Sequence, residues 1–317
     1  MLTRRHLRIK VLQILYAYYQ SEEKDTVKTN REMQRSIDRI YDLYLFYLLI
    51  LPELVTVATK EIETNLGKHR PTKEELSPDR RFVNNRIMQH FLTNVNLRKK
   101  STERAINWND GKKQGLMRRL LQQIKASANY QQYMSSTDAS FETDSVFVQN
   151  LFVDDIANSE ILQDFFEEES IYWMDDIDLV CGAVLKTIRT VTPESDLNLP
   201  LADLHRDEAD EKEFVTSLFY KTLENDAESD KLIAELAKNW DLERLARMDI
   251  ILLKMAFTEF TSISSIPKKV TLNEYIEISK FYSTPKSQQF INGILDKAIV
   301  QLEKDGKLIK TGRGLMN

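Results

Sequence analysis

The sequence predicts an all-α protein, because helical periodicity runs through nearly all of its 317 residues. Apolar residues recur at steps of three and four, the spacing that places them on one face of a helix. Glycine and proline are scarce, with 8 and 7 residues respectively, and no segment alternates apolar and polar residues as a half-buried strand would. A chain of this length can form two domains with a substantial core.

The first expected helix spans residues 3–20. Its apolar stripe consists of Leu7, Val11, Ile14, Leu15 and Tyr18. A second helix is expected over residues 31–66, with a kink or break at Pro52, because proline lacks the N–H that an inner helical turn requires. Its apolar run, Leu43-YLFYLLILP, is about half of the ~20 residues that span a bilayer. We therefore expect a buried helix and no membrane span.

Further helices are expected over 80–98, 114–134, 144–156, 159–190, 208–225, 228–239, 241–260, 271–282 and 285–304. The turn-rich segment Val191-TPESDLNLPLADLH is the expected hinge between two bodies. Thr271 with Glu274 predicts a capping box, and Thr284 followed by Pro285 predicts the start of the last helix. Gly293 costs roughly 1 kcal/mol in mid-helix, so we expect it to allow a close helix approach.

The chain holds one cysteine, Cys181, which excludes an intramolecular disulfide and a zinc cluster built from cysteines. Cys181 lies in an apolar segment and is expected to be a core residue rather than a nucleophile. The basic start is followed by Lys10, Gln13 and Gln20, which interrupt any signal-peptide apolar region. These observations predict a cytoplasmic protein, and we expect no metal and no cofactor.

Positive charge is concentrated at the start of the chain, although the formal net charge is −5. The first twenty residues contain no acid and four cations, which are Arg4, Arg5, Arg8 and Lys10. Cations at a helix N-terminus are unfavourable by roughly 0.3–1 kcal/mol each, so something should compensate them. One interpretation is an anion such as nucleic-acid phosphate, and the other is a solvated arm that serves solubility.

Two further segments carry opposite charge. Residues 93–125 hold nine lysines and arginines against two acids, whereas residues 138–178 hold thirteen acids and no Lys or Arg. The basic segment could be a second nucleic-acid surface, or the two segments could pair with each other. The acidic segment contains no histidine, so we do not expect it to bind a metal.

Three stretches of the sequence resemble one family. They are Arg4-RHLRIKVLQILYAYY, Asn239-WDLERLARMDIILLKMAFTEF and Ile266-PKKVTLNEYIEISKFYSTPKSQQFINGILDK. Together they resemble the bacterial transcription antitermination factor NusB, and the order and spacing of the last two also match. The resemblance implies a NusB-like pair of helical bundles.

The resemblance divides the chain unevenly. Residues 1–20 would be the first helix of the NusB-like core and its RNA-binding arm, residues 205–305 the rest of that core, and residues 306–317 a basic tail. Residues 21–200 have no counterpart, so we expect an inserted helical bundle whose role the resemblance does not indicate.

The family binds RNA and is not enzymatic. The resemblance implies that this chain binds boxA-like single-stranded RNA of nascent ribosomal transcripts together with the ribosomal protein NusE, within the antitermination complex of RNA polymerase. The residues carried over to RNA binding are Arg4, Arg5, Arg8, Lys10, Lys286, Gln288 and Asn292. Those carried over to NusE binding are Glu243 and Asp249.

Two other functions stay open from the sequence. A NusB-like module also serves as the RNA-positioning domain of certain ribosomal RNA methyltransferases, but no Gly-rich strand-to-helix turn for a methyl donor occurs here. The second is a helical scaffold that binds proteins through its charged segments, with RNA binding lost or secondary.

Overall fold

The computed structural model describes residues 1–237, 246–308, 310–311 and 315. Within these residues the regular structure is helical and includes no strand, which confirms the all-α prediction. The chain divides into two compact units, one formed by Met1 and residues 38–204 and the other by residues 2–37 and 205–317. The expected insert began at residue 21, whereas residues 21–37 group with the second of these units.

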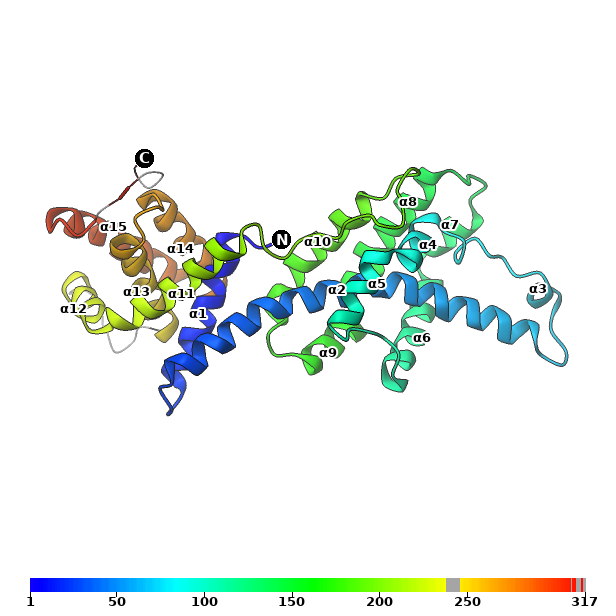
Figure 1. Ribbon diagram of the computed structural model, residues 1–317, viewed down its shortest axis with the longest axis horizontal. Helices are drawn as coiled ribbons and strands as arrows, with labels where there is room; N and C mark the ends of the chain where they lie inside the picture. Colours follow the sequence, from blue (N-terminus) through cyan, green and yellow to red (C-terminus); the bar gives the residue numbers. More distant parts are fainter. Residues whose placement is uncertain (238–245, 309, 312–314, 316–317) are drawn as a thin grey trace. The chain divides into compact units, whose positions relative to one another are not determined.

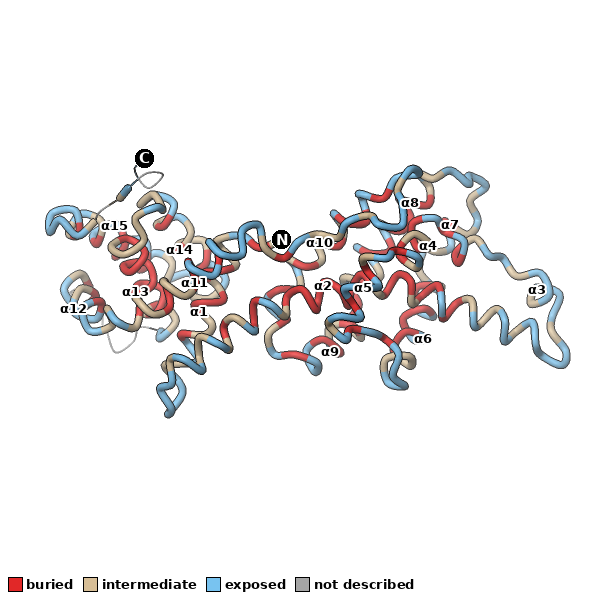
Figure 2. Tube along the Cα trace, in the orientation of Figure 1, coloured by how far each residue is buried: buried red, intermediate tan, exposed pale blue. Residues whose placement is uncertain are grey.

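The unit of residues 2–37 and 205–317, here called the C-terminal unit, contains α1 and α11 to α15 together with the start of α2 (Figure 1). Their bounds are α1 Arg4–Gln20, α2 Thr26–Leu66, α11 Glu208–Glu224, α12 Asp226–Leu236, α13 Arg247–Ser262, α14 Lys268–Tyr282 and α15 Pro285–Lys304. Helix α13 is the central one, because it packs against α1, α11, α12, α14 and α15. Figure 2 shows it buried along most of its length.

Of the two helix caps predicted in the C-terminal unit, one is present and the other is not. Thr284 caps α15 by accepting a hydrogen bond from the Ser287 N–H at 3.2 Å, and Pro285 occupies the first turn, as predicted. The capping box of Thr271 and Glu274 is wrong, because α14 already begins at Lys268. Thr271 therefore lies inside the helix, where its hydroxyl is buried.

The unit of Met1 and residues 38–204, here called the insert unit, contains the rest of α2 and the helices up to α10. Their bounds are α3 Lys73–Leu76, α4 Arg86–Thr93, α5 Val95–Glu103, α6 Gly111–Ala126, α7 Ala128–Ser135, α8 Phe141–Asn150, η1 Leu151–Ala157, α9 Glu160–Glu169, η2 Met174–Asp176 and α10 Ile177–Arg189. Helix α2 supplies its core, since Trp108 Nε1 donates to the Phe46 carbonyl at 3.1 Å and Trp173 Nε1 to the Arg39 carbonyl at 2.9 Å.

Helix α2 continues through Pro52 without a break. It is long and apolar enough to cross a membrane by length and composition, but 78% of its most apolar window is buried inside the protein. The predicted buried helix is confirmed, because residues 43–52 are buried apart from Leu49, which is half-buried.

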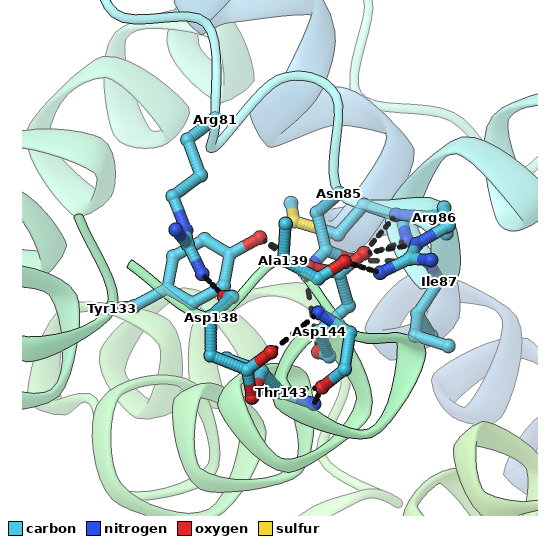
Figure 3. A network of polar contacts seen from close by, with 11 residues as sticks. Arg81, Asn85, Arg86, Ile87, Tyr133, Asp138, Ala139, Thr143 and Asp144 are labelled. Atoms are coloured by element: carbon cyan, nitrogen blue, oxygen red, sulfur yellow. Dashed lines mark hydrogen bonds and ion pairs between the residues drawn. The ribbon is translucent and has the colours of Figure 1, made fainter. Parts of the chain in front are cut away.

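A polar network joins α4, α7 and α8 of the insert unit (Figure 3). Asn85 caps α4 by accepting from the Ile87 and Met88 N–H groups at 3.0 and 3.1 Å, and its Nδ2 donates to the Tyr133 hydroxyl at 3.1 Å. Tyr133 donates to Asp144 at 2.7 Å, and Arg86 Nε donates to the same carboxylate at 2.6 Å. The buried side chains of Asn85, Tyr133 and Asp144 each have a hydrogen-bond partner, so these contacts stabilise the unit.

Candidate functional site

The arginines of α1 are held by acidic residues of their own unit. Thr3 caps the helix, and its hydroxyl accepts from the His6 N–H at 3.5 Å. Arg4 forms an ion pair with Asp210, and its guanidinium lies 4.2 Å from the centre of the Phe214 ring. Both partners belong to α11. The compensating charge that the sequence called for is therefore supplied from within the unit.

Arg5 makes a bidentate pair with Glu274 of α14. Its Nε donates at 2.9 Å and its Nη2 at 2.8 Å. This hydrogen bonding holds the pKa of the Glu274 carboxyl below its usual value. The Arg5 side chain is nevertheless 41% exposed, so part of it stays open to solvent.

Arg8 lies in the core, contrary to its expected contact with RNA phosphate. Its side chain is 1% exposed and makes a bidentate pair with Glu259, at 2.8 and 2.7 Å, while Glu259 is fully buried. The same carboxylate accepts from the Thr271 hydroxyl at 2.7 Å and from the Tyr275 hydroxyl at 3.2 Å. A buried carboxylate requires such donors, so Arg8 has a structural role in this conformation.

Lys10 is also buried, with 1% of its surface exposed. Like Arg8, it is not placed at a surface where RNA phosphate could reach it. Two of the four cations that open the chain, Arg4 and Arg5, thus remain partly exposed.

The predicted RNA residues of α15 lie at or near the surface. Lys286 and Asn292 are exposed and Gln288 is half-buried. These residues of α15 lie away from the arginines of α1. Helix α13 contacts Arg8 through Glu259, and it contacts the α14–α15 turn through Asp249. Ten residues of helix separate these two positions, which corresponds to about 15 Å.

Of the two residues expected to contact NusE, the structure describes only Asp249. Asp249 is 1% exposed and accepts a hydrogen bond from the Ser283 hydroxyl, so it pins the α14–α15 turn instead of facing outwards. Glu243 lies outside the described residues.

Gly293 was expected to allow a close helix approach, but the structure shows none at this position. A Cβ at this position would meet nothing within 4 Å, and the residue is exposed. The structure shows no packing reason for glycine there.

The two charged segments of the insert unit pair only in part. In the part of the chain that the structure describes, one ion pair joins them, between Lys112 and Glu168 at 2.6 Å. Arg104 pairs with Asp38 and Asp42 of α2. Arg118 and Arg119 are exposed.

Cys181, the single cysteine of the chain, lies within the described ranges and is half-buried. Burial raises the pKa of the Cys181 thiol to about 11, which keeps it protonated and a poor nucleophile at neutral pH. In these same ranges no three His, Cys, Asp or Glu side chains gather in a way that could hold a metal ion.

Comparison with known proteins finds relatives for the C-terminal third of the chain. The sequence model of the NusB family matches residues 182–300. A protein of Geobacter sulfurreducens named transcription antitermination protein NusB is 40% identical over 112 residues, which are 34% of this chain and 81% of that relative. The chain belongs to the NusB family.

Two other NusB proteins match the chain. That of Salinibacter ruber is 44% identical over 105 residues, and that of Chloroherpeton thalassium is 41% identical over 106. Each match spans 33% of this chain, but 66% and 50% respectively of the relative. The chain therefore spans about two thirds and one half of these two relatives. No solved structure matches the chain.

The NusB match leaves α1 and most of the insert unit outside its range, since it begins at residue 182. Sequence reasoning missed Glu259 and Asp210 as partners of the α1 arginines. A signal for Glu259 was available, because an acid inside an apolar helix must find a cation or several donors.

Proposed function

We propose that the protein is an RNA-binding transcription antitermination factor. It binds boxA-like single-stranded RNA of nascent ribosomal transcripts together with NusE, within the RNA polymerase antitermination complex in the cytoplasm, and it catalyses no reaction. The observation that supports this most is the 40% identity across 81% of a protein named transcription antitermination protein NusB.

Charge favours the C-terminal unit as the RNA-binding part. Its residues include 25 lysines and arginines and 23 acids, whereas the insert unit has 19 and 26. Nucleic acid is attracted by positive potential, and each phosphate contact adds to the salt dependence of binding.

The proposed RNA residues are those that remain accessible. Lys286 is exposed and can hold a phosphate, while the amides of Gln288 and Asn292 can bond base edges. The solvent-facing sides of Arg4 and Arg5 form a second contact. We leave Arg8 and Lys10 out of the RNA surface because both are buried.

The NusE contact is proposed from the family alone. Glu243 remains its candidate residue, and Asp249 acts indirectly by fixing the α14–α15 turn. Because NusE is basic in this family, an acidic contact on this chain suits it electrostatically.

Filter binding tests the proposal. Labelled boxA-like RNA and a scrambled RNA of equal length are titrated with the full chain, with and without NusE. The proposal predicts tighter binding of the boxA-like RNA and a further gain when NusE is added. Equal, weak binding of both RNAs with no effect of NusE would instead favour a protein-binding scaffold.

A further inference from the structure

The turn between α14 and α15 exposes an aromatic ring. Phe281 is 78% exposed, the highest fraction for any aromatic side chain in the described part of the chain, and Tyr16 follows at 36%. The buried residues of α14 are Thr271, Tyr275, Ile278 and Ser279, and the stripe that they form points towards Tyr282, so Phe281 lies beyond its edge. Among the described residues, this position on the helix leaves the ring exposed.

The turn that carries Phe281 is fixed on both sides. The Ser283 hydroxyl donates to the buried Asp249, and the Ser283 N–H donates to the Ser279 carbonyl at 2.9 Å. On the other side, Thr284 caps α15. The ring is thus presented from a pinned turn, which lowers the entropy cost of binding a ligand.

The surroundings of Phe281 suit RNA. Lys280 forms an ion pair with Glu277, whereas Lys286 is exposed and has no ion pair in the described ranges. The amides of Gln289 and Asn292 are exposed along the next turns of α15. An aromatic face, a cation and amides are the groups by which proteins stack bases, hold phosphates and bond base edges of single strands.

We propose that Phe281 is a stacking platform for one base of single-stranded RNA, with Lys286 holding a neighbouring phosphate. This inference rests on the proposed RNA binding of the C-terminal unit and adds a contact residue to it. An apolar protein partner suits the site less, because covering this turn would desolvate Lys286, five positions after Phe281, without a counter-charge. RNA supplies both a π-face and the charge.

The test uses boxA-like RNA with 2-aminopurine placed at successive positions, titrated with the full chain. Because this base loses fluorescence when it stacks, quenching at one position reports contact with the ring. Phe281→Ala should abolish that quenching and weaken binding about 5- to 150-fold. Its salt slope should match that of the unmodified protein, whereas Lys286→Ala should reduce the slope by about one.

Three controls separate stacking from other effects. Phe281→Trp should keep both affinity and quenching, while Phe281→Leu, which is apolar but has no π-face, should not. Val300 is an exposed apolar residue of α15, with 67% of its surface exposed, and it serves as the matched control. Val300→Ala should leave RNA binding unchanged. Circular dichroism should be the same for all variants, because these side chains are exposed.

The outcomes distinguish this inference from the proposed function. If the unmodified protein binds no RNA, the proposed function fails and this inference fails with it. If the protein binds RNA but Phe281→Ala binds equally well, the stacking platform alone is wrong. Full affinity in Phe281→Leu, or a Phe281→Ala defect confined to NusE binding, would likewise overturn it.

Discussion

Replacing Arg8 tests whether it is a structural residue. Arg8→Met leaves the Glu259 carboxylate fully buried with two neutral donors, Thr271 and Tyr275. Removing one partner of a buried ion pair costs about 3–5 kcal/mol, because the remaining charge is uncompensated. For a unit of this size, that loss lowers the melting temperature by roughly 6–20 °C.

The matched control is Arg5→Met. The Arg5–Glu274 pair is also bidentate, but its side chains are 41% and 20% exposed, so solvent screens it. We expect a loss of about 1 kcal/mol or less. The double variant Arg8→Met with Glu259→Gln removes both charges and keeps an acceptor for Thr271 and Tyr275. It should be more stable than Arg8→Met alone, with a coupling energy of about 2 kcal/mol.

Calorimetry and urea unfolding followed by circular dichroism measure these differences. The folded fraction of Arg8→Met should retain the RNA salt slope of the unmodified protein. A loss below about 1 kcal/mol, together with a salt slope reduced by about one, would show that Arg8 binds phosphate and that the structural reasoning is wrong.

Three other predictions follow from single positions. Gly293→Ala should raise the free energy of unfolding by about 1 kcal/mol in urea titrations, because the site is exposed and helical with open space around it; destabilisation would mean that a neighbour is crowded. Glu274 has a lowered pKa, so its contribution to stability is present above the usual pKa of 4.5 and is lost as the pH falls through the folded-state value. Melting temperatures of Glu274→Gln should therefore fall less steeply on acidification than those of the unmodified protein, and parallel curves would contradict this. Glu168→Gln breaks the exposed pair with Lys112, whose side chains are 65% and 72% exposed, and should change the melting temperature little; a drop of many degrees would show that pairing of the charged segments stabilises the insert unit.

The helices could largely be predicted from the sequence, because apolar spacing determines which face is buried. In α1, Leu7, Val11 and Leu15 of the predicted stripe are buried, whereas Ile14 and Tyr18 are half-buried. The first residue of a helix was harder to predict where a capping-box spacing occurs inside the helix. Thr271 and Glu274 have the spacing of a capping box, but both side chains bond to partners from other helices.

The site was harder to predict, because its decisive contacts join residues far apart in the chain. Arg8 and Glu259 are separated by 251 positions, so charge near the N-terminus could not show which arginine would be buried. Phe281 could have been found, since it lies off the apolar stripe of its helix. Asp249 could not, because its role depends on a bond across the α14–α15 turn.

Photocrosslinking with 4-thiouridine in boxA-like RNA, followed by mass spectrometry of the linked peptides, tests most directly whether the C-terminal unit binds RNA. We expect crosslinks to peptides from the α14–α15 turn and the first turns of α15, with a second set at the start of α1. Crosslinks confined to residues 38–204 would contradict this expectation.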